Sequence, residues 1–239
     1  MGNFWNIVNK VIEKSDIILL ILDARMPELT RHAEIEDKVK RTGKKLLYIY
    51  NKSDLLAELP FTMLRPSVVV SSTKRLGGTR LYKKILELSK GKECKVGVLG
   101  YPNVGKSSVI NLIKGASSAR VSSVAGMTRG VQWIKAGSKI WLLDTPGVIP
   151  YNERDTAKHV RIGTKNPHEL RDPDVFAMEF IQENPDLIEK HYSVKHGDDA
   201  YDTLEKLAVT KKLFIRGSKP DIERMARKLL EDWQRGKLK

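Results

Sequence analysis

The residues best suited to chemistry form the segment GYPNVGKS at positions 100–107. It fits the pattern G-x4-G-K-S and lies between an apolar run at residues 95–99 and a helical pattern, the context that a phosphate-binding loop requires. Glycines let the backbone curl so that successive N–H groups face phosphate oxygens, and the start of the helix adds its dipole. We therefore predict a phosphate site formed by Asn103, Val104, Gly105, Lys106, Ser107 and Ser108.

The expected ligand is a nucleoside triphosphate with Mg²⁺. Lys106 is placed to neutralise the β and γ phosphates, and the Ser107 hydroxyl to ligate the metal. The tetrapeptide DTPG follows the apolar run 140–143, and its Asp144 is 37 positions after Ser107. Asp144 is expected to hold Mg²⁺ through water, and the Gly147 backbone N–H to reach the γ phosphate. Thr128, in the segment GMTRG, is expected to complete the Mg²⁺ shell, although alone it reads equally well as a threonine in a glycine turn.

A second motif predicts which base is bound. Asn51, Lys52, Ser53 and Asp54 follow the apolar run 45–50. A carboxylate such as Asp54 accepts both N1–H and N2–H of guanine, a donor pair that adenine lacks, so the motif selects GTP and GDP. Asn51 is expected to contact N7 and brace the loop, and the Lys52 stem to pack on the base. The triplet Ser71, Ser72 and Thr73 is expected near guanine O6.

These motifs need an α/β framework. Continuous apolar runs of strand length predict strands covered by helices on both faces, at residues 17–22, 45–50, 68–70, 95–99, 131–135 and 140–143. Helical patterns are expected at residues 4–14, 32–41, 81–88 and 107–113. The alternation is typical of a doubly wound sheet.

Beyond residue 165 the pattern changes. Helix-like segments are separated by Asn-Pro, Asp-Pro and glycine breaks, so we expect a first domain at residues 1–165 and a small helical domain at 166–239. Its last helix is expected to have Ser218 as its cap and Pro220 in its first turn. The apolar face would consist of Ile222, Met225, Ala226, Leu229, Leu230 and Trp233.

Composition narrows the class further. The 239 residues are 41% hydrophobic, and no apolar run reaches the roughly 20 residues of a membrane span. The N-terminus lacks a signal-peptide pattern, so a cytoplasmic location without membrane association is expected. The single cysteine, Cys94, excludes an internal disulfide and is interpreted as a core residue. The five histidines form no metal-binding pattern and are expected at the surface.

The net charge of +14 indicates a polyanionic partner. Residues 1–150 contain 25 Lys+Arg and 12 Asp+Glu, whereas residues 151–239 contain 18 and 17. Two dense basic stretches are Lys38, Lys40, Arg41, Lys44, Lys45 and Lys74, Arg75, Arg80, Lys83, Lys84. RNA phosphate would satisfy them, and DNA is not expected. A lysine-rich solvated surface is the alternative reading.

The order of the motifs is unusual, because the base-reading NKSD precedes the phosphate loop instead of following it. Over essentially the whole chain the sequence resembles the circularly permuted GTPases involved in ribosome assembly, with motif order G4, G5, G1, G2, G3. The segment DARMP at residues 23–27 and the ending DWQRGKL at residues 232–238 also resemble that family. The resemblance implies a P-loop NTPase fold with a mostly parallel six-stranded sheet and a small C-terminal helical domain. It also implies GTP hydrolysis and a switch that acts on ribosomal RNA or a ribosomal subunit in large-subunit assembly.

Two departures concern catalysis. Bacterial members begin with a histidine-containing segment, whereas residues 1–6 contain no histidine. Ras-type proteins place a glutamine after DxxG, whereas this chain has Val148 and Ile149, so slow intrinsic hydrolysis is expected. Lys106, Thr128 and Gly147 remain the expected catalytic residues. Asn103 matches the P-loop asparagine of potassium-activated GTPases, which implies a K⁺ site; the alternative is that Asn103 only stabilises the loop.

Two rival functions differ in testable ways. A P-loop kinase or ATPase would share the phosphate loop, but Asp54 argues for guanine. A GTP-dependent regulatory switch that binds a protein partner without RNA would lack salt-sensitive RNA binding.

Overall fold

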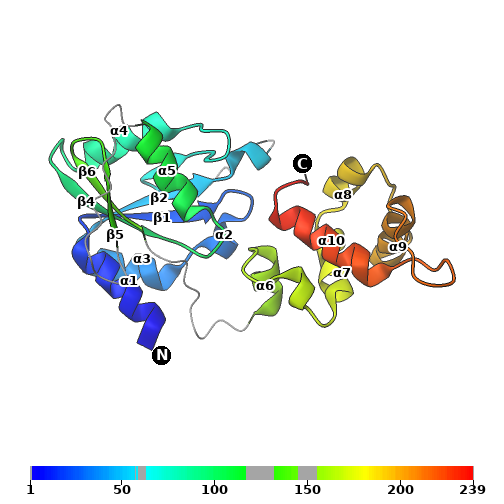
Figure 1. Cartoon of the computed structure of the whole chain (residues 1–239). Helices are drawn as coiled ribbons and strands as arrows, with labels where there is room; N and C mark the ends of the chain where they lie inside the picture. The colour runs from blue at the N-terminus through cyan, green and yellow to red at the C-terminus, as the bar shows by residue number, and fades with distance from the viewer. Residues whose placement is uncertain (1, 57, 59–62, 117–131, 145–154, 239) are drawn as a thin grey trace. The chain divides into compact units, whose positions relative to one another are not determined.

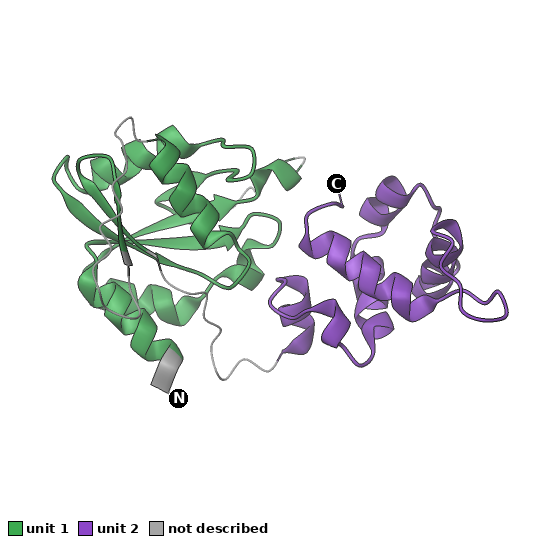
Figure 2. Cartoon of the chain, viewed as in Figure 1, with its two compact units in different colours: residues 1–154 green, residues 155–239 purple. Residues whose placement is uncertain are grey.

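The computed structural model describes residues 2–56, 58, 63–116, 132–144 and 155–238 (Figure 1). The chain divides into two compact units, residues 1–154 and 155–239 (Figure 2). The sequence placed the boundary at 165/166. It falls earlier because α6 (Thr156–Arg161) packs with the second unit, where Val160 is buried in the core. No helix in the described part of the chain is both long enough and apolar enough to cross a membrane.

The first unit contains a six-stranded sheet in the order β3-β2-β1-β4-β6-β5. The strands are β1 (Ile17–Asp23), β2 (Lys45–Asn51), β3 (Ser67–Val69), β4 (Cys94–Leu99), β5 (Gln132–Ala136) and β6 (Ile140–Asp144). All neighbours are parallel except β5, which is antiparallel to β6. The six expected strands and the mostly parallel sheet are confirmed.

Helices cover both faces of this sheet. On one face lie α1 (Gly2–Lys14) and α3 (Ala33–Arg41), and on the other lie α4 (Gly78–Leu88) and α5 (Lys106–Ala116) (Figure 1). Every residue of β1 is buried, as expected for a central strand between two helical layers. The short helix α2 (Pro27–Thr30) and the 3-10 turn η1 (Ser53–Leu55) follow β1 and β2.

The parallel arrangement brings several strand ends to one edge of the sheet. The carboxyl ends of β1, β2, β3, β4 and β6 are Asp23, Asn51, Val69, Leu99 and Asp144. The motif NKSD, the triplet Ser71 to Thr73, the phosphate loop and DTPG each follow or end one of these strands. In an open α/β sheet, ligands bind at this edge.

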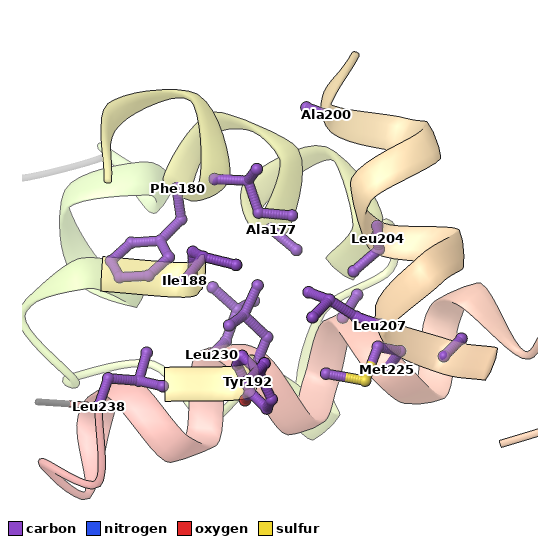
Figure 3. Close-up of a cluster of buried hydrophobic side chains, with 14 of the residues drawn as sticks. Ala177, Phe180, Ile188, Tyr192, Ala200, Leu204, Leu207, Met225, Leu230 and Leu238 are labelled. Carbon is purple, nitrogen blue, oxygen red and sulfur yellow. The ribbon is translucent and has the colours of Figure 1, made fainter. Parts of the chain in front are cut away.

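The second unit is helical. After α6 come the 3-10 turn η2 (Pro167–Glu169), α7 (Pro173–Glu183), α8 (Pro185–Tyr192), α9 (Ala200–Thr210) and α10 (Ile222–Gln234). Figure 3 shows side chains from these helices, among them Phe180, Leu204, Leu207 and Leu230, meeting in one apolar cluster. The expected helical domain and the apolar face of its last helix are therefore present.

The start of the last helix differs from the expectation. The first residue of α10 is Ile222, and the Asp221 side chain caps it by accepting from the Arg224 backbone N–H. Ser218 and Pro220 instead belong to the preceding turn, since Pro220 forms a β-bridge with Phe214. Ser218 has φ 59°, a backbone conformation that an N-cap does not use.

Two buried carboxylates tie elements together away from the predicted site. Glu36 is 1% exposed and accepts from the Arg31 guanidinium at 2.7 and 2.9 Å and from the Tyr48 hydroxyl at 2.9 Å. In the second unit, Asp232 is 4% exposed and pairs with Lys228 at 3.1 Å and Lys237 at 2.8 Å.

Candidate nucleotide-binding site

The phosphate loop connects β4 to α5 through backbone conformations that favour glycine. Gly100 has φ 147°, and a Cβ there would lie 2.6 Å from the Ile21 carbonyl oxygen. Gly105 has φ 96°, and a Cβ there would collide with the Asn51 amide nitrogen. Asn103 has φ 62°, a region that asparagine tolerates better than most residues. Both glycines are therefore required for the loop to pass close to its neighbours.

Lys106 is held at this loop by a bond to the backbone. Lys106 is only 7% exposed, and its Nζ donates to the Tyr101 carbonyl oxygen at 2.6 Å. Ser107 and Ser108 follow in the first turn of α5 and are exposed. An ammonium group, serine hydroxyls and helix N–H groups thus gather at one helix start, as the sequence predicted for a phosphate site.

Asn51 joins the base-reading motif to two other segments. It is 1% exposed, donates from Nδ2 to the Val104 carbonyl oxygen at 2.9 Å and accepts at Oδ1 from the Ser72 backbone N–H at 3.1 Å. This is the bracing role expected for Asn51. The second N–H of Nδ2 is the group that the expected contact with guanine N7 would use.

Asp54 is oriented by the following loop. The Ser71 hydroxyl donates to Asp54 Oδ1 at 2.6 Å and accepts from the Lys74 backbone N–H at 3.0 Å. Ser71 is fully buried, whereas Ser72 is half-buried and Thr73 is exposed. Ser71 therefore supports the Asp54 carboxylate, and contact with guanine O6 stays a prediction for Ser72 and Thr73.

Lys52 is anchored by a carboxylate that sequence reasoning did not assign to the site. Its backbone is left-handed, with φ 66°, and Nζ lies 2.8 Å from Asp23 Oδ2. Asp23, which is 1% exposed, also accepts from Arg25 Nη2 at 2.8 Å and Arg25 Nε at 3.1 Å. The signal that could have found Asp23 is positional, because it ends β1 directly beside Asn51 in the sheet register.

The electrostatics of this cluster keep Asp23 ionised. Burial raises the pKa of Asp23, but the bonds and charge of Arg25, together with Lys52, outweigh it and hold the pKa below its usual value. Burial lowers the pKa of Lys52, and the charge of Asp23 offsets this in part. Asp23 thus lies between two basic groups at the edge of the sheet where the motifs meet.

Part of the predicted site lies outside the described residues. Thr128 and Gly147 belong to residues 117–131 and 145–154, and of Asp144 only the backbone is described, at the end of β6. β6 is the immediate neighbour of β4, so Asp144 ends beside the strand that leads into the phosphate loop. Among the described side chains, no group of three or more His, Cys, Asp or Glu could hold a metal. A Mg²⁺ ion here would need phosphate oxygens and water, an arrangement that suits this ion and the exposed Ser107 hydroxyl.

One histidine lies closer to the site than expected. The His32 ring stacks on Phe4 at a centroid distance of 5.6 Å and on Tyr101 of the phosphate loop at 6.0 Å. Of the five histidines His168 is exposed, and the other four are half-buried. The stack packs α1 and the start of α3 against the phosphate loop, a role that sequence periodicity did not indicate.

Comparison with known proteins identifies relatives for both the site and the fold. A family model for 50S ribosome-binding GTPases matches residues 95–202. An uncharacterised GTP-binding protein of Methanocaldococcus jannaschii is 36% identical over 245 residues, covering 97% of this chain and 65% of that protein. Nucleolar GTP-binding protein 2 of Neurospora crassa is 31% identical over 252 residues, covering 98% of this chain and 40% of that protein. The chain thus spans less than two thirds of the length of either relative.

The fold also matches a solved structure. GNP-bound YlqF from T. maritima aligns with a TM-score of 0.65 at 17% sequence identity, covering 98% of this chain and 94% of that chain. At this identity the likeness concerns the fold alone. It confirms the α/β P-loop architecture followed by a helical region.

Proposed function

We propose that the chain is a circularly permuted GTPase, which binds GTP and GDP and hydrolyses GTP to GDP and phosphate. One observation carries the proposal. Asn51 bonds to both the phosphate loop and Ser72, while Ser71 bonds to Asp54, so segments far apart in sequence form one network at one sheet edge. A phosphate cradle joined to a guanine-selective carboxylate is what guanine-nucleotide binding requires.

The residues have separate roles in this proposal. Lys106, whose Nζ donates to the Tyr101 carbonyl, would neutralise the β and γ phosphates of a bound nucleotide. Ser107, Asp144 and Thr128 would hold Mg²⁺, and the Gly147 N–H would contact the γ phosphate. Mg²⁺, when bound, supplies positive charge to the phosphate oxygens during transfer.

Asn103 is proposed as a ligand of K⁺ beside the β and γ phosphates. It is exposed in the phosphate loop with its backbone held at φ 62°. A monovalent cation here would supply charge in a chain whose position after DTPG is occupied by Val148.

For the partner, we propose ribosomal RNA in a large ribosomal subunit or its precursor. The first unit supports this, with 26 Lys+Arg and 13 Asp+Glu in residues 1–154, whereas residues 155–239 contain 17 and 16. A basic excess of this kind favours binding to nucleic-acid phosphates. The description of the matching family, 50S ribosome-binding GTPases, supports a ribosomal role.

The structure separates the two basic stretches. Lys40 and Arg41 end α3 and Lys45 begins β2, so this stretch lies at the amino edge of β2, away from the motifs. Lys74 and Arg75 lie between Ser71 and α4, at the edge that carries the motifs, and both are exposed. RNA contacts that respond to the nucleotide are therefore expected at Lys74 and Arg75.

Two measurements test the proposal. Isothermal titration of GDP and ADP into the protein should show binding of GDP only, and equal affinity for both nucleotides would remove the guanine assignment. Co-sedimentation with large ribosomal subunits should depend on the nucleotide and fall steeply with salt. The double variant Lys74→Glu/Arg75→Glu should lose the nucleotide-dependent part of the binding to ribosomal subunits. The matched variant Lys40→Glu/Arg41→Glu should retain it.

A protein-binding switch without RNA is the alternative. It would give salt-insensitive binding to a ribosomal or other protein and no affinity for naked RNA. The expected cytoplasmic location stays a prediction, since several relatives carry nucleolar names.

A further inference from the structure

We propose that Asp23 is a positioning residue of the nucleotide site, acting through Lys52, and that Arg25 positions the Asp23 carboxylate in turn. The inference rests on the proposed guanine-nucleotide site and adds residues from the end of β1 to it. The resemblance pointed to the segment DARMP without a chemical role. The structure assigns one from the contacts that its first and third residues make.

Lys52 is fixed at both ends of its side chain. Its Cα lies in a left-handed turn directly after β2, and its Nζ is paired with Asp23 Oδ2 at 2.8 Å. The aliphatic stem between these points is therefore restricted, although 19% of the side chain remains exposed. A lysine stem that packs on a base loses rotamer freedom on binding, and a stem ordered beforehand loses less.

Asp23 is itself held in one orientation. Both of its carboxylate oxygens accept from the Arg25 guanidinium, and Oδ1 also accepts from the Arg25 backbone N–H at 3.1 Å. The Asp23 backbone N–H donates to the Thr30 hydroxyl at 3.0 Å. A bidentate arginine fixes the plane of a carboxylate, so the position of Oδ2, and with it of Lys52 Nζ, is set by the end of β1.

A purely structural role for Asp23 does not explain why its partner is Lys52. Glu36 is as buried as Asp23 and is likewise paired with an arginine in the same unit, but its partners Arg31 and Tyr48 belong to no nucleotide motif. The buried Asp23, in contrast, pairs with the lysine of the base-reading motif. Loss of either carboxylate is expected to destabilise the fold, whereas only loss of Asp23 should alter the binding of the base.

The proposed action predicts a specific pattern of affinities. Lys52 would contact the face of the base, and Asp54 would read its edge. Loss of the Asp23 carboxylate should therefore weaken the binding of GDP and of inosine diphosphate by the same factor, because the two bases present similar faces. Changing Asp54 should instead change the ratio between them, because inosine lacks the N2 amino group.

The experiment is a double-mutant cycle by isothermal titration on the full chain, with Asp23→Asn, Lys52→Met and the pair. Lys52→Met keeps an apolar stem and removes the ammonium. Asp23→Asn and Lys52→Met should each lower the affinity for GDP by about tenfold. The double variant should bind GDP no more weakly than Lys52→Met alone. Glu36→Gln is the matched control and should lower the melting temperature while leaving GDP affinity within about threefold.

Several outcomes would overturn the inference. One is a Lys52→Met variant that binds GDP as tightly as wild type. Another is a double variant in which the losses of GDP affinity of the two single variants multiply. The third is a Glu36→Gln variant that loses as much GDP affinity as Asp23→Asn. If Asp23→Asn does not fold, Lys52→Arg decides in its place: it keeps a cation for Asp23 and should bind GDP more tightly than Lys52→Met, and equal affinities would contradict the anchor. If wild type fails to bind GDP, the proposed function itself is wrong, which is a different result from a wild type that binds and an Asp23→Asn that binds equally well.

Discussion

The Asn51 side chain donates to the Val104 carbonyl oxygen at 2.9 Å, although the two residues are 53 positions apart. This bond connects the end of β2 with the phosphate loop. Because the other end of the amide accepts from the Ser72 backbone, one buried side chain links the base loop, the phosphate loop and the segment after β3. Nucleotide binding should therefore depend on Asn51 even before any contact with the ligand is counted.

Asn51→Ala is expected to lower stability and nucleotide affinity together. It leaves the Val104 carbonyl and the Ser72 N–H without their partner in a buried place, which costs about 1–3 kcal/mol. Thermal unfolding without nucleotide measures the first effect, and titration with GDP measures the second. An unchanged melting temperature would contradict the bracing role. Ser108→Ala, an exposed change in the first turn of α5, is the control for stability.

Asp54→Asn should abolish the preference for guanine. A carboxylate has two acceptor oxygens for the N1–H and N2–H of guanine, whereas an amide has one oxygen and one NH₂ group that donates. The expected loss of GDP affinity is about 2 kcal/mol or more, since a ligand donor is left unpaired. Ser71→Ala should give a smaller loss, because it frees the carboxylate without removing it. Competition of GDP, inosine diphosphate and ADP for the site measures both. The assignment fails if Asp54→Asn keeps the wild-type order of affinities.

Basal GTP hydrolysis should be slow and faster in KCl than in matched NaCl. We expect about a tenfold difference, equivalent to about 1.4 kcal/mol in the barrier. Asn103→Ala should remove the difference while retaining GDP binding. Phosphate release at constant ionic strength provides the measurement. Stimulation by K⁺ that survives Asn103→Ala would rule out this residue as the ligand.

The stability of the second unit should depend on pH through Asp232. Burial raises the pKa of Asp232, but Lys237 and Lys228 outweigh it, so the pKa is lower in the folded chain than in the unfolded chain. Such a group stabilises the fold above its unfolded pKa of about 3.9, and the contribution is lost as the pH falls through the folded pKa.

Asp232→Asn should accordingly destabilise the protein at pH 7 and approach wild-type stability in the acid range below about pH 4. Unfolding midpoints across the pH range, followed by the intrinsic fluorescence of the tryptophans, provide the readout. Glu231→Gln disrupts the more exposed pair with Arg235 and should cost less than about 1 kcal/mol at any pH. A constant difference between wild type and Asp232→Asn would show that the carboxylate charge is not the cause.

The first turn of α10 offers a direct test of the revised cap. Asp221→Ala removes the acceptor of the Arg224 N–H and should cost about 1 kcal/mol. Ser218→Gly should be neutral or stabilising, since it places glycine at φ 59°. Urea unfolding of the two variants distinguishes this cap from the one first expected. A larger loss for Ser218→Gly than for Asp221→Ala would restore Ser218.

Much of the nucleotide site followed from sequence, because its chemistry is local. The glycines of the phosphate loop, Lys106 and Ser107 have to be adjacent for one turn to hold phosphate, so their spacing is written in the chain. The buried strands β1 and β2 were likewise visible as continuous apolar runs, since strands covered on both faces carry no polar alternation. The order of the motifs already indicated the permutation.

The partners of those residues depended on the tertiary structure. Asp23 meets Lys52 because β1 and β2 are parallel and in register, so that Asp23 lies opposite Asn51, and no spacing in the sequence encodes that register. The same reason applies to Ser71, whose burial beneath Asp54 depends on how β3 is placed beside β2. The sequence determined which side chains could bind and select a nucleotide. The fold decided which of them support others, because a parallel sheet brings residues from distant segments to one edge and pairs them by geometry alone.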